Sequence, residues 1–270
     1  MKEIEENKHA WGQISQDHYV AFKKALMEGT HQFNAYIRQE LGDLSGKSII
    51  HLQCNTGADT ILLAQMGASA VGVDLVPDNI LYARKLAQDL QIGNVTFIEA
   101  DIMQFMEQHN EQYDVVFVSE GALCWLPDLE KWGKTIRHLL KEDGFFYVFD
   151  NHPFFMMFDE HKLPDNKMEV KYPYFGKEPD VDEWIGGYAS EPRRGVQAYS
   201  WMYTVSDILN ALIAAGLHID YFHEFQENFF NARGMKELGN GLWNYEFNGG
   251  RFPISFSLRA KVYHEKTPRQ

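Results

Sequence analysis

The feature that most constrains this chain is a regular alternation, over residues 48–150, of short apolar runs and longer segments with helical spacing. The apolar runs are SIIHLQ, AVGVDL, VTFIEA, YDVVFVS and FFYVFD. Helical spacing fills the intervals, in DTILLAQMGA, in the stretch that Pro77 opens, in DIMQFMEQH and in LEKWGKTIRHLLKEDG. Parallel strands need long crossovers, usually helices, and such a sheet is buried on both faces. The pattern therefore predicts an α/β domain whose parallel strands are joined by right-handed crossovers.

The flanking segments follow other patterns. Residues 1–45 carry apolar side chains at steps of three and four, which predicts an N-terminal helical cap broken into two helices at Gly29-Thr30. Residues 151–200 hold five prolines and no clear period, which is typical of a lid or binding loop. From Thr204 a capping box predicts a helix that stops at Gly216, and two alternating segments, LHIDYFHEF and ISFSLRAKVY, predict antiparallel strands. We expect a cap over 1–45, a core over 46–153, a lid over 154–200 and a C-terminal part over 201–270.

The charge balance narrows the classes of partner. Asp and Glu number 38 against 25 Lys and Arg, a formal net charge of −13. Such a surface repels phosphate backbones, so we expect a small-molecule substrate rather than nucleic acid. No apolar run approaches the roughly 20 residues of a membrane-spanning helix, and the first residues lack the apolar core of a signal peptide. These observations predict a cytoplasmic protein without a membrane partner, either a monomer or a homodimer.

The cysteine and histidine content predicts no metal site. Cys54 and Cys124 form neither a disulfide framework nor a CxxC pair, which fits a reducing compartment. The eleven histidines show no paired ligand spacing, and Asp159-Glu160-His161 lacks the HExxH arrangement. Cys54 is better explained as a small buried hydrophobe than as a nucleophile.

Polar residues follow the predicted strands at the edge where such sheets bind ligands. The first strand leads into Gln53, Asn55, Thr56 and Gly57, and ligands of open parallel sheets lie beyond the carboxyl ends of the strands. The second strand ends at Asp74, whose carboxylate can accept hydrogen bonds from a ribose diol. Further along, Asp101 can accept a hydrogen bond from an adenine amino group, Ile102 offers an apolar surface, and the fourth strand ends in Ser119-Glu120-Gly121.

The loop after the first strand discriminates between two cofactor classes. A dinucleotide site needs GxGxxG so that the backbone can approach the pyrophosphate. Here Gly57 is the one glycine of the loop, and Gln53 and Asn55 would place side chains against a pyrophosphate. S-adenosylmethionine has no phosphate, and its carboxylate and ammonium can hydrogen-bond to amide side chains. The residues therefore favour S-adenosylmethionine over a nicotinamide cofactor.

Five ordered motifs resemble those of class I S-adenosylmethionine-dependent methyltransferases: HLQCNTGADT, VGVDLVPDNILYAR, FIEAD, YDVVFVSEGALCWLPDL and LLKEDGFFYVFD. The resemblance covers about residues 45–153. The chain also resembles a bacterial subgroup whose first loop reads HLQCxxGxDT, with a WLPDL segment and a His-Pro pair that match Trp125–Leu129 and His152-Pro153. The chain departs from the broader family at His51, which replaces an acid, and at Gln53 and Asn55, which replace glycines.

The resemblance implies a Rossmann-like, seven-stranded, mostly parallel sheet whose last strand is antiparallel, with S-adenosyl-L-methionine as cofactor. It agrees with the strand count obtained from the apolar runs. The residues expected at the cofactor are Trp11, Gln53, Asn55, Thr56, Gly57, Asp74, Leu75, Asp101, Ile102, Ser119 and Glu120.

Several of these residues have a structural alternative. Asp74 and Asp101 could cap the helices expected after them, and Asp128 is most simply a helix cap. Trp125 could pack the interior or wall a pocket. His152 could act as a general base or orient a substrate, or it could be a structural hydrogen-bonding residue.

The predicted function is in-line transfer of a methyl group from S-adenosylmethionine to a small-molecule acceptor. The N-terminal helices, with Trp11 and Tyr19, and residues 151–200 are expected to close over the site. Two alternatives remain, a nicotinamide-dependent oxidoreductase and a non-catalytic S-adenosylmethionine-binding module.

Overall fold

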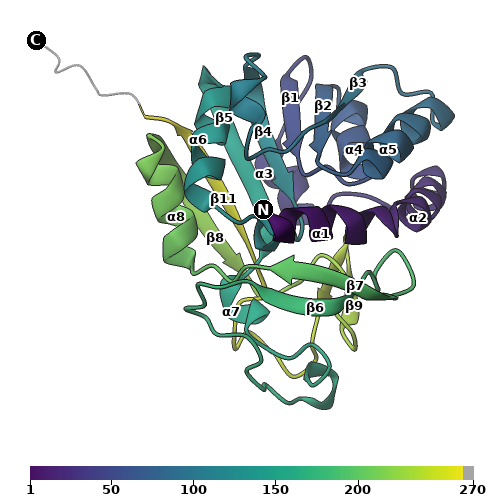
Figure 1. Ribbon diagram of the computed structural model, residues 1–270, viewed down its shortest axis with the longest axis vertical. Helices are drawn as coiled ribbons and strands as arrows, with labels where there is room; N and C mark the ends of the chain where they lie inside the picture. The colour runs from purple at the N-terminus through teal and green to yellow at the C-terminus, as the bar shows by residue number, and fades with distance from the viewer. Residues whose placement is uncertain (264–270) are drawn as a thin grey trace, which may run out of the picture.

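A mixed β-sheet forms the centre of the computed structural model, which describes residues 1–263 (Figure 1). Within these residues, seven strands follow the order β3-β2-β1-β4-β5-β11-β8. The parallel strands are β1 (Ser48–Leu52), β2 (Ser69–Asp74), β3 (Val95–Glu99), β4 (Tyr113–Ser119) and β5 (Leu140–Asn151). The last strand, β11 (Ser255–Val262), runs antiparallel to both β5 and β8 (Leu217–Phe225). The predicted sheet, with its antiparallel final strand, is confirmed.

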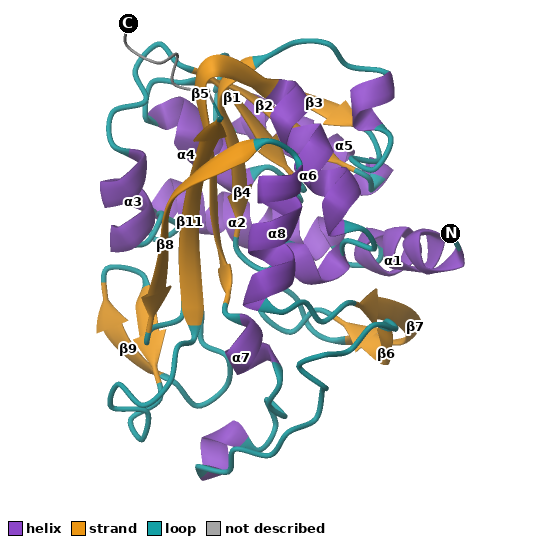
Figure 2. Cartoon of the chain, turned by 90° about the vertical axis from the view of Figure 1, so that its left-hand side faces the viewer, coloured by secondary structure: helices purple, strands orange, loops and turns teal. Residues whose placement is uncertain are grey.

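Helices cover both faces of this sheet, as the alternation of strand side chains requires. On β4, Val115 and Phe117 face the helix layer that contains α3 (Ala35–Leu41) and α4 (Ala58–Gln65). The helix α5 (Pro77–Asp89) belongs to the same layer and packs on Phe97 of β3. The next residues along β4, Val116 and Val118, face the opposite layer of α6 (Leu129–Leu139) and α8 (Val205–Ala214). The result is a three-layer α/β arrangement (Figure 2).

The expected helix signals lie at helix ends. Pro77 opens α5, where its missing N–H costs no hydrogen bond. Asp128 caps α6 by accepting from the Lys131 N–H at 2.9 Å, and Thr204 and Asp207 form the capping box of α8. Gly29 ends α2 (Ser15–Glu28) with a φ of 70°, a left-handed conformation that favours glycine.

Three predictions of secondary structure are wrong. Residues 101–109 form only the 3₁₀ turn η1 (Phe105–Glu107), because the Asp101 carboxylate accepts from the Met103 N–H at 2.8 Å and holds a turn there. The N-terminal region is broken twice, since α1 (Lys2–Gly12) and α2 are separated at Gln13-Ile14. Residues 180–200 are not irregular but form an antiparallel pair, β6 (Asp180–Ile185) and β7 (Arg193–Ser200).

Short elements complete the chain around the carboxyl edge of the sheet. They are η2 (Leu123–Trp125), α7 (Pro153–Met156), η3 (Leu163–Asp165), β9 (Lys236–Gly239) and β10 (Leu242–Asn244). Phe155 and Phe158 share an apolar cluster with Tyr245 and Phe252, so the segments after β5 and after β8 pack on each other.

The β6–β7 pair is attached to the N-terminal helix, as both views show (Figures 1 and 2). Ala10 and Ile14 share an apolar cluster with Ile185 and Ala198. The buried Asn7 side chain donates to the Tyr199 carbonyl at 2.8 Å and accepts from the Tyr199 N–H at 2.6 Å. In this way α1 and the β6–β7 pair form one covering element.

Replacing Asn7 should loosen this cover without unfolding the sheet. In Asn7→Ala the Tyr199 N–H and carbonyl lose their partners, a cost of about 1–2 kcal/mol. We expect proteolysis within residues 186–192 to become about tenfold faster while the melting temperature changes little. Glu5→Ala, at an exposed position of the same helix, is the matched control. Equal cleavage rates in the two variants would show that Asn7 does not hold the cover.

Candidate functional site

The loop between β1 and α4 makes a tight left-handed bend. Gln53, Asn55 and Gly57 all have positive φ values, of 57°, 50° and 79°. Two hydrogen bonds fix the bend between neighbouring strand ends: the Asn55 N–H donates to Asp74 at 2.8 Å, and the Gln53 amide donates to the Ala122 carbonyl at 2.8 Å. The loop is thereby held between the end of β2 and the turn after β4.

Gly57 is required where α4 begins. A Cβ atom at this position would lie 2.6 Å from Cε1 of Phe97 and 2.9 Å from Cβ of Ala83. The same edge of the Phe97 ring packs closely on Gly72, where a Cβ atom would lie 2.7 Å from Cδ1 of the ring. The start of α4 is therefore pressed directly against β3 and α5.

Asp74 is buried beside this loop, with 8% of its surface exposed. Its carboxylate accepts from the N–H groups of Asn55 and Val76, at 2.8 and 2.9 Å, and from the Asn79 amide at 3.1 Å. Burial raises the pKa of Asp74 to about 6, although these hydrogen bonds favour its ionised form. Asp74 is not the cap of α5, because the N-cap residue is Val76 and no side chain caps this helix. The bond to Val76 holds the residue before the helix, and ribose binding stays a prediction.

The residues expected to bind adenine, Asp101 and Ile102, follow β3 and form hydrogen bonds within the protein. Asp101 accepts from the Met103 N–H, and Ile102 is 5% exposed, with its carbonyl accepting from Thr135 at 3.2 Å. Leu75 is half-buried directly after β2. Adenine recognition by this edge also stays a prediction.

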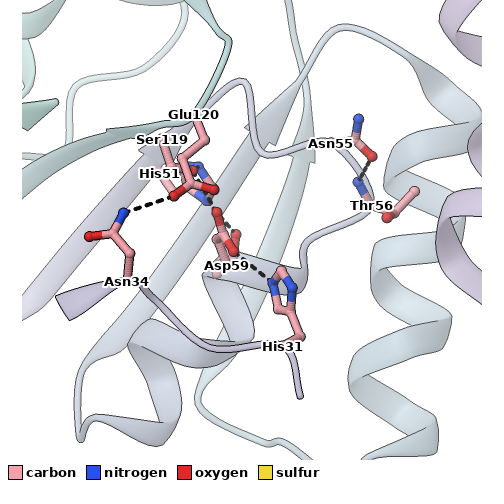
Figure 3. A network of polar contacts seen from close by, with 9 residues as sticks. His31, Asn34, His51, Asn55, Thr56, Asp59, Ser119 and Glu120 are labelled. Carbon is pink, nitrogen blue, oxygen red and sulfur yellow. Dashed lines mark hydrogen bonds and ion pairs between the residues drawn. The ribbon is translucent and has the colours of Figure 1, made fainter. Parts of the chain in front are cut away.

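A buried polar network lies at the ends of β1 and β4 (Figure 3). Asp59, in the first turn of α4, bonds to His31 at 2.8 Å and accepts from the Ser119 hydroxyl at 2.7 Å. Ser119 also lies 3.1 Å from Nε2 of His51. Burial lowers the pKa of His51 to about 4, so this ring is neutral. Burial opposes ionisation of Asp59, but the bond and charge of His31 outweigh it and lower the pKa of Asp59.

Glu120 follows Ser119 in a strained turn, with a φ of 42°. Its N–H donates to the Phe149 carbonyl at 2.8 Å, and its carboxylate accepts from the Asn34 amide at 3.2 Å. Burial raises the pKa of Glu120, and the nearby carboxylates of Asp59 and Asp150 raise it further.

Aromatic side chains from the covering elements face the loop. His18 is fully buried in α2, and its Nδ1 lies 3.1 Å from the Asn55 side-chain oxygen and 3.5 Å from the hydroxyl of Tyr188, which lies between β6 and β7. Trp11 meets His18 and Trp125 edge-to-face, with ring centroids 5.8 and 5.2 Å apart. Trp11 is therefore close to the loop through His18, while Trp125 packs on the apolar cluster of α1.

Several buried polar atoms around this loop have no hydrogen-bond partner within residues 1–263. They are Gln53 Oε1, Thr56 Oγ1, His18 Nε2 and Asn151 Oδ1. Unpartnered buried groups are costly and rare in folded proteins. Other such atoms lie elsewhere in residues 1–263, but those of Gln53 and Thr56 belong to the loop after β1 and that of His18 lies beside it, where a ligand can supply the missing partners.

His152 and Cys54 lie in structural environments. His152 is 4% exposed, its Nδ1 accepts from the Phe154 N–H at 3.0 Å, and its Nε2 lies 3.0 Å from the Glu224 carboxylate. Burial lowers the pKa of His152. These contacts support its structural alternative, and its catalytic role stays an untested prediction. Cys54 is 3% exposed, and burial raises its pKa, which disfavours the reactive thiolate.

Sequence reasoning missed Asp59, His31 and Asn34. Asp59 had a usable signal, since it is the first residue of the expected helical segment DTILLAQMGA. His31 and Asn34 had none, because the connection between α2 and α3 brings them to the site from 28 and 86 residues away in sequence. Within the part of the chain that the structure describes, no group of three or more potential ligands could hold a metal ion, and no helix is long and apolar enough to span a bilayer.

A family profile, curated relatives and solved structures all relate this chain to methyltransferases. The sequence profile of a family described as "Methyltransferase domain" matches residues 43–178. A ubiquinone biosynthesis O-methyltransferase of Glaesserella parasuis is 28% identical over 118 residues, which is 42% of this chain and 49% of the relative. The chain thus spans about half the length of the curated relatives it matches.

Two solved structures share the fold over most of the chain. An S-adenosylmethionine-dependent methyltransferase from Mesorhizobium loti superposes with a TM-score of 0.56 at 21% identity, covering 83% of this chain and 95% of that one. A DhpI–SAH complex superposes with a TM-score of 0.57 at 15% identity, covering 97% of this chain and 98% of that one.

Proposed function

Because the chain belongs to the family of methyltransferase domains, we propose that it transfers the methyl group of S-adenosylmethionine to a small-molecule acceptor. The observation that carries this proposal is the bend at residues 53–57 with its unpartnered polar atoms. A phosphate-free nucleoside with an amino-acid tail fits this donor set, because its ammonium can donate to the Gln53 oxygen and its polar groups can bond to Thr56 and His18. The DhpI–SAH complex shows that a protein of this fold binds the corresponding demethylated compound.

Different residues at the strand ends bind different parts of the cofactor. We assign the ribose hydroxyls to Asp74 and Leu75, the adenine to Asp101 and Ile102, and the amino-acid tail to the loop. Ser119, Glu120 and Trp11 border the same space. The cofactor supplies a methyl group already activated by its sulfonium. The protein therefore has to align an acceptor with the bond that breaks and to exclude water.

Water exclusion is assigned to the elements that cover the carboxyl edge. In the division proposed here, residues 1–45 form a cap, 46–153 the cofactor-binding core, 154–200 a lid and 201–270 the part that completes the sheet. The contacts of α1 with β6 and β7 support a cap and lid that act together.

The acceptor is assigned to a pocket beside the turn after β4. Apolar side chains dominate its lining, among them Leu123, Pro153, Met156, Trp201 and Met202. Asn151 also lines this pocket, and its buried Oδ1 has no partner in residues 1–263. The cavity has about 30 Å³ of space, room for one water-sized group, so it can take only the reacting end of an acceptor, and Asn151 supports an end that carries a hydrogen-bond donor.

Two measurements test the proposal. Calorimetric titration should show binding of S-adenosylmethionine and S-adenosylhomocysteine and none of NADH. Methyl-labelled donor should then transfer label to a member of a panel of phenols, amines and thiols, in which phenols are included because one relative is an O-methyltransferase. Absence of donor binding would contradict the proposal. Donor binding without transfer to any acceptor would favour a non-catalytic binding module.

Donor affinity should fall as the pH falls through about 6. Asp74, whose folded-state pKa is raised to about 6, takes up a proton there and accepts the ribose hydroxyls less well. If binding needs its ionised form, affinity drops about tenfold from pH 7 to pH 5. Burial lowers the pKa of His18, and it lowers that of His51 to about 4, so the His51 ring stays neutral over that range.

The raised pKa of Asp74 affects folding stability in the opposite direction from donor affinity. A carboxyl group whose pKa is raised by folding stabilises the folded state at pH values below its unfolded-state pKa of about 4. This contribution is lost as the pH rises through the folded-state pKa of about 6. A donor affinity that is flat from pH 5 to 7, in a protein that remains folded, would remove Asp74 from the binding site.

A further inference from the structure

We propose that Glu120 makes the donor site prefer the positively charged methyl donor over its neutral demethylated product. This inference rests on the proposed function. It concerns the discrimination between two forms of one ligand, and it assigns that discrimination to the turn after β4.

Glu120 is an acid without a cationic partner in residues 1–263, and because burial raises its pKa, a cationic ligand is needed to favour its ionised form. Asn34 is the single side chain of the described chain that donates a hydrogen bond to it, at 3.2 Å. Within residues 1–263, no lysine, arginine or histidine forms an ion pair with Glu120. An acid that is largely removed from water and not paired is unfavourable unless a ligand compensates its charge.

The two neighbouring carboxylates are already satisfied by the protein. Asp59 uses one oxygen for His31 and the other for Ser119. Asp150 accepts from the N–H groups of Gly121, Ala122, Leu123 and Asn151 at 2.6 to 3.0 Å. Glu120 is therefore the acid of this group with acceptor capacity left for a ligand, and its neighbours make the surroundings more negative.

The turn that carries Glu120 faces the cofactor loop. Gln53 of the loop donates to Ala122, two residues beyond Glu120. Tyr188, between β6 and β7, also faces this loop, because its hydroxyl lies 3.5 Å from Nδ1 of His18, and the same nitrogen lies 3.1 Å from the Asn55 side-chain oxygen. The Tyr188 ring lies 4.9 Å from that of His18, which is fully buried and whose Nε2 has no partner. An unpartnered buried side chain thus lies beside the cofactor loop, independently of the acids.

Methyl transfer changes the charge that Glu120 faces. A lone pair of the acceptor forms a bond to the methyl carbon while the carbon–sulfur bond breaks, and its electron pair stays on sulfur. The sulfonium becomes a neutral thioether, and the proton of the acceptor passes to solvent. A carboxylate next to the sulfur stabilises the bound donor, which is positively charged there, and does not stabilise the neutral product. The product is therefore replaced more readily by new donor.

Three ligands test this role by calorimetric titration of the full chain. S-adenosylmethionine carries a charged sulfonium, sinefungin carries a charged amine in its place, and S-adenosylhomocysteine is neutral there, while all three share the adenosine and the amino-acid tail. Glu120→Gln should weaken S-adenosylmethionine and sinefungin by about tenfold and leave S-adenosylhomocysteine within twofold. Glu130→Gln removes one charge at an exposed position of α6 and should change none of the three.

The other outcomes overturn the inference in distinguishable ways. Equal weakening of all three ligands would assign Glu120 to the shared amino-acid tail, and no change in any of them would remove it from the site. If the unchanged protein binds none of the three, the proposed function itself fails. Thermal unfolding of Glu120→Gln without ligand checks that the variant is folded.

Discussion

Gly57→Ala is expected to lower the free energy of unfolding by about 3 kcal/mol or more and to abolish donor binding at millimolar concentrations. The left-handed φ of 79° penalises any side chain, and the added Cβ would lie 2.6 Å from the Phe97 ring and 2.9 Å from Ala83. The Phe97 ring is closely packed, since the same edge also lies against Gly72. The strain would displace the first turn of α4, and with it both Asp59 and the bend at residues 53–57.

Urea unfolding and calorimetric titration measure the two effects. Gly93→Ala is the matched control, because no atom lies within 4 Å of its added Cβ and the residue does not have a left-handed φ. This control should unfold and bind like the unchanged protein. A Gly57→Ala variant with unchanged stability and donor affinity would show that α4 can shift without affecting the site.

Asp74→Asn should weaken donor binding by about 100-fold at pH 7 while leaving the protein folded. The carboxylate accepts from Asn55, Val76 and Asn79, and an amide nitrogen in place of either oxygen would face an N–H donor. The bend would lose its tie to β2, and the ribose would lose a charged acceptor, at about 1.5–3 kcal/mol for each charged hydrogen bond. Folding should tolerate the change, because burial already penalises the charge of Asp74 and raises its pKa.

Titration with S-adenosylhomocysteine at pH 5 and pH 7 gives a second readout. The Asp74→Asn variant should lose most of the dependence of affinity on pH, because the group that takes up the proton near pH 6 is gone. Asp143→Asn, which changes an exposed acid in β5, is the control and should retain both the donor affinity and its dependence on pH. Unchanged affinity in Asp74→Asn would leave Asp74 as a structural support of the loop and of α5.

Caps and glycines could be predicted from sequence because their effect is local. Asp128 and Thr204 each accept from an N–H group three residues further on, and Pro77 has a fixed φ that suits the first turn of a helix. Gly29 has a left-handed backbone angle that few other residues adopt. The loop at residues 53–57 was also recognisable, since it joins two predictable elements. The failure at residues 101–109 is local as well, because a helical spacing of apolar residues did not reveal that Asp101 would cap a short turn.

The alternation of apolar strands and helical segments determined the sheet, its parallel core and its covered faces, because each strand and helix buries a face that its own residues define. The tertiary structure alone decided which distant polar residues meet. The connection after α2 brings His31 to Asp59 and Asn34 to Glu120, and α1 brings Asn7 to Tyr199. Such pairs leave no periodic trace in the sequence, since a hydrogen bond between two side chains depends on where two separate elements dock and not on the spacing within either one.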